Sequence, residues 1–539
     1  MLMPMPAFFF RILGATLPLA SPPSVPSDHP ILERNASSTI SEPAKNMPAD
    51  QSTIPETTAD EDLQKGALYF YGKGVPQDYA EAFRWYKKSA DRGNLEAMTL
   101  LGNMFILGEG VPKNYDTAFQ LFSSAAQSGY SLAQNNLATM YENGWAVEQD
   151  IPKALELYRQ AAEQKNPFAQ ANLGRFYENG IGVEKNLTEA FNYYREAADQ
   201  NNPQGLNAVG RFYLEVLNPK DYNKALEYFQ KAAKLKYVHS ENNLGVMYEN
   251  GWGIPSNISA ALAAYKQAAD QGNPYAQANL GRLYESGKGV QKDYTEAIRW
   301  YQKAADQGLD IAQNDLGRMY QYGWGVPQDF QTALKFYQMA AKNGLGSAET
   351  NIGVMYENGI GVQKNYEQAF NWYQKAADHE NPEGQYNLAL MYENGRGIQP
   401  NLQTAAQYYQ LAASQGSSLA QNNLGVFYLT GKGVEKDLKR AFDLFTQAAE
   451  SGHPVAASNL GRLYETGSGV PQDYLKALYW YQKSAEQNDP LGLYYLGRLY
   501  INGLGTQKKG QEGLDLFKRA ARLGNPQAQA ELQKQNLSW

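Results

Sequence analysis

One stretch of about 36 residues recurs along most of the chain, and this repeat limits the possible folds more than any other feature. The clearest copy, residues 273–308, reads NPYAQANLGRLYESGKGVQKDYTEAIRWYQKAADQG. In its first half Ala276, Leu280 and Leu283 follow the spacing of one face of an amphipathic helix. A single copy is too small to bury a core, so copies must stack on their neighbours.

Each copy is predicted to contain two helices. Asn273 followed by Pro274 is typical of a helix start, and Gly287 is typical of a helix end. Asp293 begins the second helix with the spacing of a capping box. The glycine in the middle of the first helix, Gly281, predicts a close approach by small alanines of the second helix.

This central glycine, or an alanine in its place, counts thirteen repeats. It is found at Gly66, Gly102, Ala138, Gly174, Gly210, Gly245, Gly281, Gly317, Gly353, Ala389, Gly425, Gly461 and Gly497. We therefore predict an all-α, right-handed superhelical α/α solenoid of about thirteen 36-residue helix-turn-helix repeats over residues 59–532, with a C-terminal tail at 533–539. The fifth repeat is one residue short, which predicts a local change of curvature near residues 214–222.

Residues 1–58 differ from the repeats, since they hold ten of the 25 prolines and show no helical period. The apolar run within residues 1–20 fits a signal peptide, although no basic residue precedes the run and Arg11 interrupts it. Residues 21–58 are predicted to be a disordered Pro/Ser/Thr-rich linker. Two localisations therefore stay open, export (periplasmic or secreted) and the cytoplasm. No stretch is apolar for long enough to predict a transmembrane segment.

Composition and motifs argue against several classes of function. A net charge of −7 with mixed signs does not favour nucleic-acid binding. The absence of cysteine excludes disulfides, thiolate metal sites and a cysteine nucleophile. The G-x-G motifs lack the preceding strand that dinucleotide binding needs, and the four histidines have unrelated spacings. We therefore predict no enzyme, no catalytic residue, no cofactor, no metal and no small-molecule substrate.

The recurring A-x-x-N-L-G-x-x-Y-x-x-G-x-G-V pattern resembles the Sel-one-like repeat, which is related to the tetratricopeptide repeat, over about residues 60–532. Departures include Ala138, Ala389, Pro219 and the pair Lys509-Gly510. The resemblance implies a scaffold or adaptor that binds a protein or peptide partner, with host interaction among the family's roles. Two alternatives stay open: a secreted cell-wall or β-lactam hydrolase, and an adaptor in membrane-protein quality control.

Two sets of polar residues on the first helices are candidates for peptide binding. An asparagine precedes the central leucine at Asn136, Asn172, Asn243, Asn279, Asn387, Asn423 and Asn459. Such a row of amides suits an extended peptide backbone, or it bonds successive helices to one another. An arginine follows the central glycine at Arg175, Arg211, Arg282, Arg318, Arg462 and Arg498.

The arginines also have two possible roles. They suit the acidic or C-terminal groups of a peptide, because a guanidinium binds a carboxylate with two parallel hydrogen bonds. Alternatively they pair within their own helix, as the i, i+3 spacing suggests for three pairs: Arg175 with Glu178, Arg282 with Glu285, and Arg462 with Glu465. The loop tryptophans Trp145, Trp252 and Trp324 are either binding hot spots or contacts to a neighbouring repeat.

Overall fold

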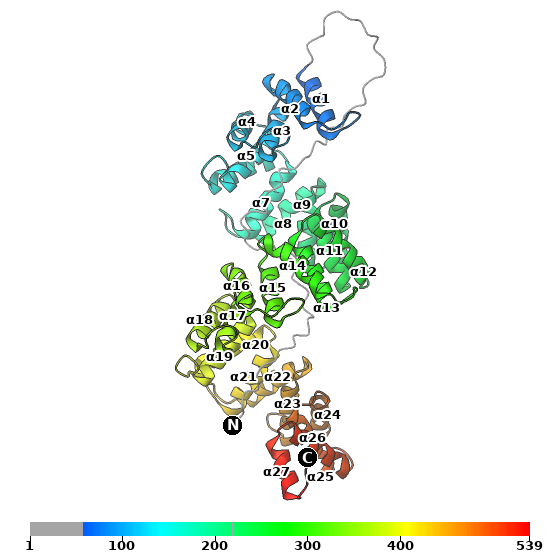
Figure 1. Cartoon of the computed structure of the whole chain (residues 1–539), viewed down its shortest axis with the longest axis vertical. Helices are drawn as coiled ribbons and strands as arrows, with labels where there is room; N and C mark the ends of the chain where they lie inside the picture. The colour runs from blue at the N-terminus through cyan, green and yellow to red at the C-terminus, as the bar shows by residue number, and fades with distance from the viewer. Residues whose placement is uncertain (1–57, 218) are drawn as a thin grey trace, which may run out of the picture. The chain divides into compact units, whose positions relative to one another are not determined.

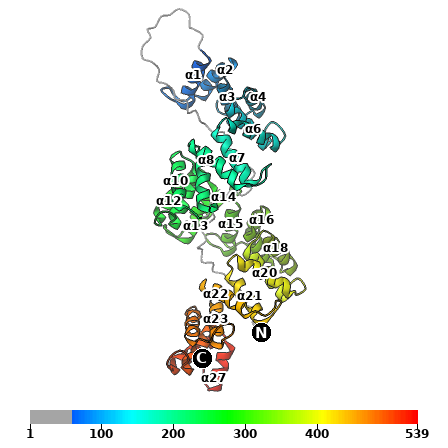
Figure 2. The ribbon, with the colours of Figure 1, turned by 180° about the vertical axis from the view of Figure 1, so that it is seen from behind.

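The computed structural model describes residues 58–217 and 219–539, and the chain divides into two units, residues 1–292 and 293–539. The described residues form twenty-seven α-helices and one π-helical turn, and they contain no strand (Figures 1 and 2). Odd-numbered helices are the first helices of the repeats, and even-numbered helices are the second. The predicted signal peptide and nearly all of the predicted linker lie outside the described residues.

The first unit holds repeats one to six and the first helix of repeat seven. Its helices are α1 (Ala59–Tyr71), α2 (Tyr79–Asp91), α3 (Leu95–Leu107), α4 (Tyr115–Gln127), α5 (Ser131–Asn143), α6 (Ile151–Glu163), α7 (Pro167–Asn179), α8 (Leu187–Asp199), α9 (Pro203–Arg211), the π-helical η1 (Phe212–Val216), α10 (Tyr222–Lys234), α11 (Val238–Asn250), α12 (Ile258–Asp270) and α13 (Pro274–Ser286).

The second unit holds the remaining repeats and a final half-repeat. Its helices are α14 (Tyr294–Asp306), α15 (Asp310–Tyr322), α16 (Phe330–Lys342), α17 (Gly346–Asn358), α18 (Tyr366–Asp378), α19 (Pro382–Asn394), α20 (Leu402–Ser414), α21 (Ser418–Thr430), α22 (Leu438–Glu450), α23 (Pro454–Thr466), α24 (Tyr474–Glu486), α25 (Pro490–Asn502), α26 (Gly510–Arg522) and α27 (Pro526–Lys534).

Capping residues set the helix ends as the repeat predicts. Asn273 caps α13 by accepting a hydrogen bond from the backbone N–H of Ala276. Gly287 ends this helix in the left-handed conformation at φ +75°, which glycine adopts without strain. Asp293 caps α14 by accepting from the backbone N–H groups of the second and third helical residues. The all-α solenoid of paired helices is therefore confirmed.

The central glycine makes room for an aromatic ring rather than for alanines. A Cβ atom on Gly174 would lie 2.7 Å from ring atoms of Tyr194, which is buried on the second helix of the same repeat. Gly245 meets Tyr265 in the same way, at 2.6 Å. The prediction of a close helix crossing is confirmed, but its reason is the thickness of a tyrosine or phenylalanine ring.

The second loop glycine holds one repeat against the next. Gly397 has φ +72°, and a Cβ atom there would lie 2.6 Å from the backbone oxygen of Tyr366, the first residue of the preceding second helix. The same contact recurs at Gly253, Gly433 and Gly505. The loops of these repeats therefore rest on the start of the preceding second helix, where glycine allows both the conformation and the contact without strain. The third repeat holds Ala146 at this position, with φ +62°.

The fifth repeat departs from the others where the sequence is one residue short. The first helix, α9, passes into the π-helical turn Phe212–Val216, which ends with a hydrogen bond from the Leu217 N–H to the Phe212 oxygen at 2.9 Å. An open recess of about 470 Å³ lies beside this turn, lined in part by Tyr213 and Tyr222. A local change of helix type is thus present, and the change of curvature stays a prediction.

Candidate functional site: polar ladders on the first helices

The asparagine row bonds successive first helices to one another. In each of six repeats the amide nitrogen donates to an amide oxygen of the preceding repeat at 2.9–3.0 Å. The pairs are Asn136 with Asn103, Asn172 with Asn135, Asn243 with Asn207, Asn279 with Asn242, Asn351 with Asn314, and Asn459 with Asn422. These amides form an inter-repeat hydrogen-bond ladder.

Two asparagines of the predicted row, Asn387 and Asn423, lie outside the ladder. Of the ladder residues, Asn136, Asn172, Asn243 and Asn279 are buried, and Asn459 is half-buried. Asn423 is also half-buried and donates to the Tyr409 hydroxyl at 3.2 Å. The half-buried amide of Asn387 makes no side-chain hydrogen bond to the described residues. It is therefore the one amide of the predicted set that the described structure leaves without an internal partner.

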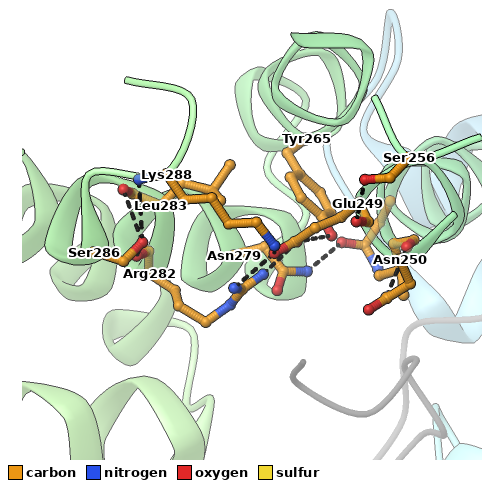
Figure 3. Close-up of polar contacts among 11 residues, drawn as sticks. Glu249, Asn250, Ser256, Tyr265, Asn279, Arg282, Leu283, Ser286 and Lys288 are labelled. Carbon is orange, nitrogen blue, oxygen red and sulfur yellow. Dashed lines mark hydrogen bonds and ion pairs between the residues drawn. The ribbon is translucent and has the colours of Figure 1, made fainter. Parts of the chain in front are cut away.

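A buried glutamate, Glu249, organises the arginine row in the sixth and seventh repeats (Figure 3). Its carboxylate accepts from Arg282 Nη1 at 2.9 Å and Nη2 at 2.5 Å, and from Lys288 Nζ at 3.0 Å. The Tyr265 hydroxyl donates to the same carboxylate at 3.0 Å. Glu249 lies on α11, Tyr265 on α12, and the two cations follow in the next repeat, so this cluster joins two repeats.

Burial and charge together set the protonation of this cluster. Burial alone would raise the pKa of Glu249, but the hydrogen bonds and positive charges of Arg282 and Lys288 outweigh it and lower the pKa below the ordinary 4.5. Burial, followed by the negative charge of Glu249, raises the pKa of Tyr265 well above its ordinary value. The cluster is therefore a neutral phenol, a carboxylate and two cations at neutral pH.

The same cluster recurs along both units with one cation in each copy. Each glutamate lies on a first helix, accepts from a tyrosine on the second helix of the same repeat, and binds a cation from the first helix or the loop of the next repeat. The other copies are Glu142 with Tyr158 and Arg175, Glu178 with Tyr194 and Arg211, Glu357 with Tyr373 and Arg396, Glu393 with Tyr409 and Lys432, and Glu465 with Tyr481 and Arg498.

The i, i+3 pairs predicted within one helix are replaced by these longer connections. Arg175 binds Glu142 of the preceding repeat at 2.7 Å, while Glu178 is held by Arg211 and Tyr194. Glu142 and Glu178 are equally exposed, at 13% of each side chain, so burial does not decide between them. Glu178 is already bound by Arg211 and Tyr194, which leaves Glu142 as the carboxylate for Arg175. Arg318 pairs within its helix, with Asp315 at 2.9 Å.

Arg462 is the exception in the arginine row. Leu429 occupies the corresponding position on the preceding first helix, where the other repeats with a paired arginine have a glutamate. Its expected partner Glu465 is bound by Arg498 and Tyr481 instead. The Arg462 side chain is exposed and makes no ion pair or side-chain hydrogen bond within residues 58–217 and 219–539.

A third polar pair joins the two helices within several of the repeats. Gln134 accepts from Gln164 at 2.7 Å, from the first helix to the end of the second, and Gln170 and Gln200 repeat the contact. In the ninth repeat the pair is Glu349, which is 2% exposed, and His379, whose Nδ1 lies 2.8 Å from the carboxylate. Different polar pairs therefore occupy this register, whereas the thirteenth repeat holds Leu493 and Leu523 there.

The loop tryptophans stack on the preceding repeat. Trp252 lies 5.8 Å from Tyr222 with nearly parallel rings, and Trp324 lies 5.7 Å from Tyr294 in the same way. In each case the tyrosine begins the preceding second helix. The three loop tryptophans are half-buried rather than exposed, so packing between repeats accounts for them.

Sequence reasoning missed the glutamates, which are the centres of the polar clusters. The signal was present as a fixed register of a glutamate on one first helix, a tyrosine on the following second helix and an arginine on the next first helix. Among the described residues, no three His, Cys, Asp or Glu side chains are grouped so that they could bind a metal ion. No helix in the described part of the chain has the length and apolar character to cross a membrane.

These observations define the class of protein as an α-solenoid of stacked helix pairs joined by polar ladders. The sequence model of the Sel1 repeat family matches thirteen segments between residues 66 and 525, at 66–94, 95–130, 131–166, 167–202, 204–237, 238–273, 274–309, 310–345, 346–381, 382–417, 418–453, 454–489 and 490–525. The chain therefore belongs to the Sel1 repeat family.

Solved structures of similar proteins include two bacterial repeat proteins. One is a protective antigen of uropathogenic Escherichia coli strains that displays an SLR fold; it is 33% identical, with 84% of this chain and 97% of that chain covered and a TM-score of 0.47. The other is a Sel1 repeat protein of Oxalobacter formigenes, 33% identical, with 57% of this chain and 89% of that chain covered and a TM-score of 0.41. No curated protein matches the chain.

Proposed function

We propose that this protein is a non-enzymatic scaffold that binds a protein or peptide partner on the surface formed by its first helices. Sel1 repeat solenoids are a fold typically used for protein–protein interaction, and this supports the general class. Most asparagines and arginines of the predicted site bond to other repeats and hold the frame together. A partner would therefore be bound by those side chains of the same helix face that make no bonds between repeats.

The observation that carries the proposal is the presence of such side chains. Asn387 and Arg462 occupy the same two registers as the paired residues, yet neither has an internal partner among the described residues. A partly buried amide or an exposed guanidinium that the frame does not use is available to the backbone or the carboxylates of a partner. A rigid frame with a few free polar groups also suits specific recognition, because little order is lost on binding.

Site-specific photo-crosslinking in the protein's own cells tests the proposal. A photoreactive amino acid replaces Asn387 on α19, or Gln407 on α20, which is exposed on the second helix of the same repeat. We expect one defined protein adduct from position 387 and none from position 407. No adduct at position 387, or the same adducts at both positions, would contradict binding on the first-helix surface.

The hydrolase alternative has a separate assay. Purified full-length protein is incubated with a chromogenic β-lactam and with peptidoglycan, and product release is measured. A scaffold gives no release above that of a heat-denatured sample. Turnover by the native chain would replace the scaffold proposal with an enzymatic one.

A further inference from the structure

Cations and carboxylates on the first helices are matched with few exceptions. A glutamate is followed by its cation either at the arginine position of the next first helix or in the next loop. Gln321 takes the glutamate position in the eighth repeat, and the arginine position of the next first helix then holds the uncharged Val354. In this pair of repeats the glutamate and the arginine are both replaced by uncharged residues. A partly buried charge without its partner would be costly, which explains why the two are replaced together.

Arg462 breaks this rule because its arginine is kept while the carboxylate is absent. The eleventh repeat has Leu429 and Phe445 where other repeats have the glutamate and its tyrosine donor. Leu429 packs against the apolar core formed in part by Phe445, so the residue in the glutamate register offers Arg462 no carboxylate. The frame therefore gains nothing from a guanidinium at position 462.

The surroundings of Arg462 combine a second cation with an apolar row. Arg498, on the next first helix, holds the same register, and its side chain is 37% exposed although it binds Glu465. Leu419, Val455 and Leu491 are half-buried on α21, α23 and α25, two helical turns before the register of Arg462. Residues at i and i+7 lie on the same helix face, so the apolar row and the cations belong to one surface.

Neighbouring contacts hold these three first helices together. The Asn459 amide on α23 donates to the Asn422 oxygen on α21 at 3.0 Å. Arg498 on α25 binds Glu465 on α23, and Tyr495 on α25 stacks on Tyr481 of the second helix α24 at 5.2 Å. The surface that presents Arg462 is thus held in place by bonds that do not involve Arg462.

We propose that Arg462 anchors a carboxylate of an extended peptide that lies across α21, α23 and α25, with apolar side chains on Leu419, Val455 and Leu491. This inference rests on the proposed scaffold function and names the partner's chemistry. A guanidinium binds a carboxylate with two charge-assisted hydrogen bonds, which gives both strength and orientation. The carboxylate comes from an acidic side chain or from the peptide's C-terminus.

Binding of synthetic peptides to the full chain tests the inference. The probe is an array of leucine-containing octapeptides in which Asp, Glu or the matching amide occupies each position, made with free and with amidated C-termini. We expect acidic peptides to bind the wild type and to lose at least tenfold in affinity with R462Q. Loss on amidation assigns the C-terminal carboxylate, and loss on Glu-to-Gln exchange assigns a side chain.

The double variant L429E/F445Y is the decisive control because it keeps Arg462. It restores the glutamate and tyrosine that other repeats pair with their arginine, so that Arg462 is bound internally and the fold gains a polar cluster already present six times. We expect it to bind acidic peptides as poorly as R462Q does. R84Q, which alters an arginine of 76% side-chain exposure in the first repeat, should bind like the wild type.

Three results would overturn the site. They are wild-type affinity in both R462Q and L429E/F445Y, equal binding of acidic and amide peptides, and no peptide bound at millimolar concentration. If crosslinking at position 387 nevertheless yields its defined adduct, the scaffold function survives and only the carboxylate site is wrong.

Discussion

The buried pair of Glu249 and Arg282 can be taken apart and rebuilt in a form that the chain itself uses. E249Q leaves the Arg282 side chain, which is 10% exposed, without its carboxylate. Removing one partner of a buried ion pair costs about 3–5 kcal/mol, and we expect about 3 kcal/mol because glutamine still accepts from Tyr265. R282V leaves Glu249 bonded to Tyr265 and Lys288, so we expect about 2 kcal/mol.

The double variant E249Q/R282V should cost much less than the sum of the two. Gln321 and Val354 form this combination in the eighth and ninth repeats, and Gln321 accepts from the Tyr337 hydroxyl at 2.7 Å. Replacing a buried ion pair by neutral, well-packed residues is often nearly neutral. We expect a total cost of about 2 kcal/mol, which gives a coupling energy of about 3 kcal/mol between the two positions.

Amide hydrogen exchange by mass spectrometry on the full chain is the assay. Repeat arrays open locally, so peptides covering α11, α12 and α13 report the free energy of opening where the substitutions lie. R84Q, at the far end of the same unit, should change exchange in these peptides by less than about 0.5 kcal/mol. Additive costs in the double variant, or a cost below about 1 kcal/mol for E249Q, would refute the view that this ion pair joins the repeats.

Three further predictions concern single residues. H379A should destabilise the ninth repeat by about 2 kcal/mol, because it leaves the carboxylate of Glu349 buried without its partner. H379Q should cost less than half as much, because the sixth repeat pairs a buried glutamate with a glutamine in this register. Hydrogen exchange of α17 and α18 measures both costs. G397A should lower the free energy of urea unfolding by about 2–3 kcal/mol. The control G416A should lower it by about 1 kcal/mol, because Gly416 also has a positive φ but a Cβ atom there would meet no atom within 4 Å. Equal costs would show that the close approach at Gly397 is not the cause. Because the pKa of Glu249 in the folded protein lies below 4.5, the ionised carboxylate stabilises the fold above pH 4.5, and this stabilisation is lost as the pH falls through the folded-state pKa. The difference in unfolding free energy between wild type and E249Q should therefore shrink as the pH falls. A constant difference from pH 6 to pH 3 would contradict this role of Glu249.

The repeat predicted the fold well because the information is local. Caps such as Asn273, the glycine at the helix end and the apolar spacing depend on residues a few positions apart, and each signal recurs along the array. The partners of polar side chains depend on contacts from one repeat to the next, which helical periodicity does not describe. Arg175 therefore seemed paired with Glu178 on its own helix, whereas it binds Glu142.

The interruption in the fifth repeat also shows how far the structure could be predicted from the sequence. The missing residue predicted a local change near residues 214–222, and the π-helical turn Phe212–Val216 overlaps the start of that range. A π-helical turn accommodates a change in length while keeping Phe212 and Leu214 buried. The chain thus changes its helix geometry instead of exposing apolar residues. The sequence alone does not show which of these two changes costs less.

Substitutions within the repeats also follow the physics of the tyrosine–glutamate contact. Where the glutamate is replaced by an aliphatic residue in Ile106, Leu429 or Ile501, the tyrosine position of the same repeat holds Phe122, Phe445 or Phe517. A buried hydroxyl that loses its acceptor costs about 1–3 kcal/mol, so the two changes stabilise each other. After Ile106 the arginine position is also changed, to Thr139, which bonds to the Tyr158 hydroxyl at 3.0 Å. After Ile501 the same register holds Lys534 of the final half-repeat, which pairs with Glu531 on its own helix. After Leu429 an arginine persists without such a pair among the described residues, and a residue that breaks a local rule is where a functional requirement should be sought.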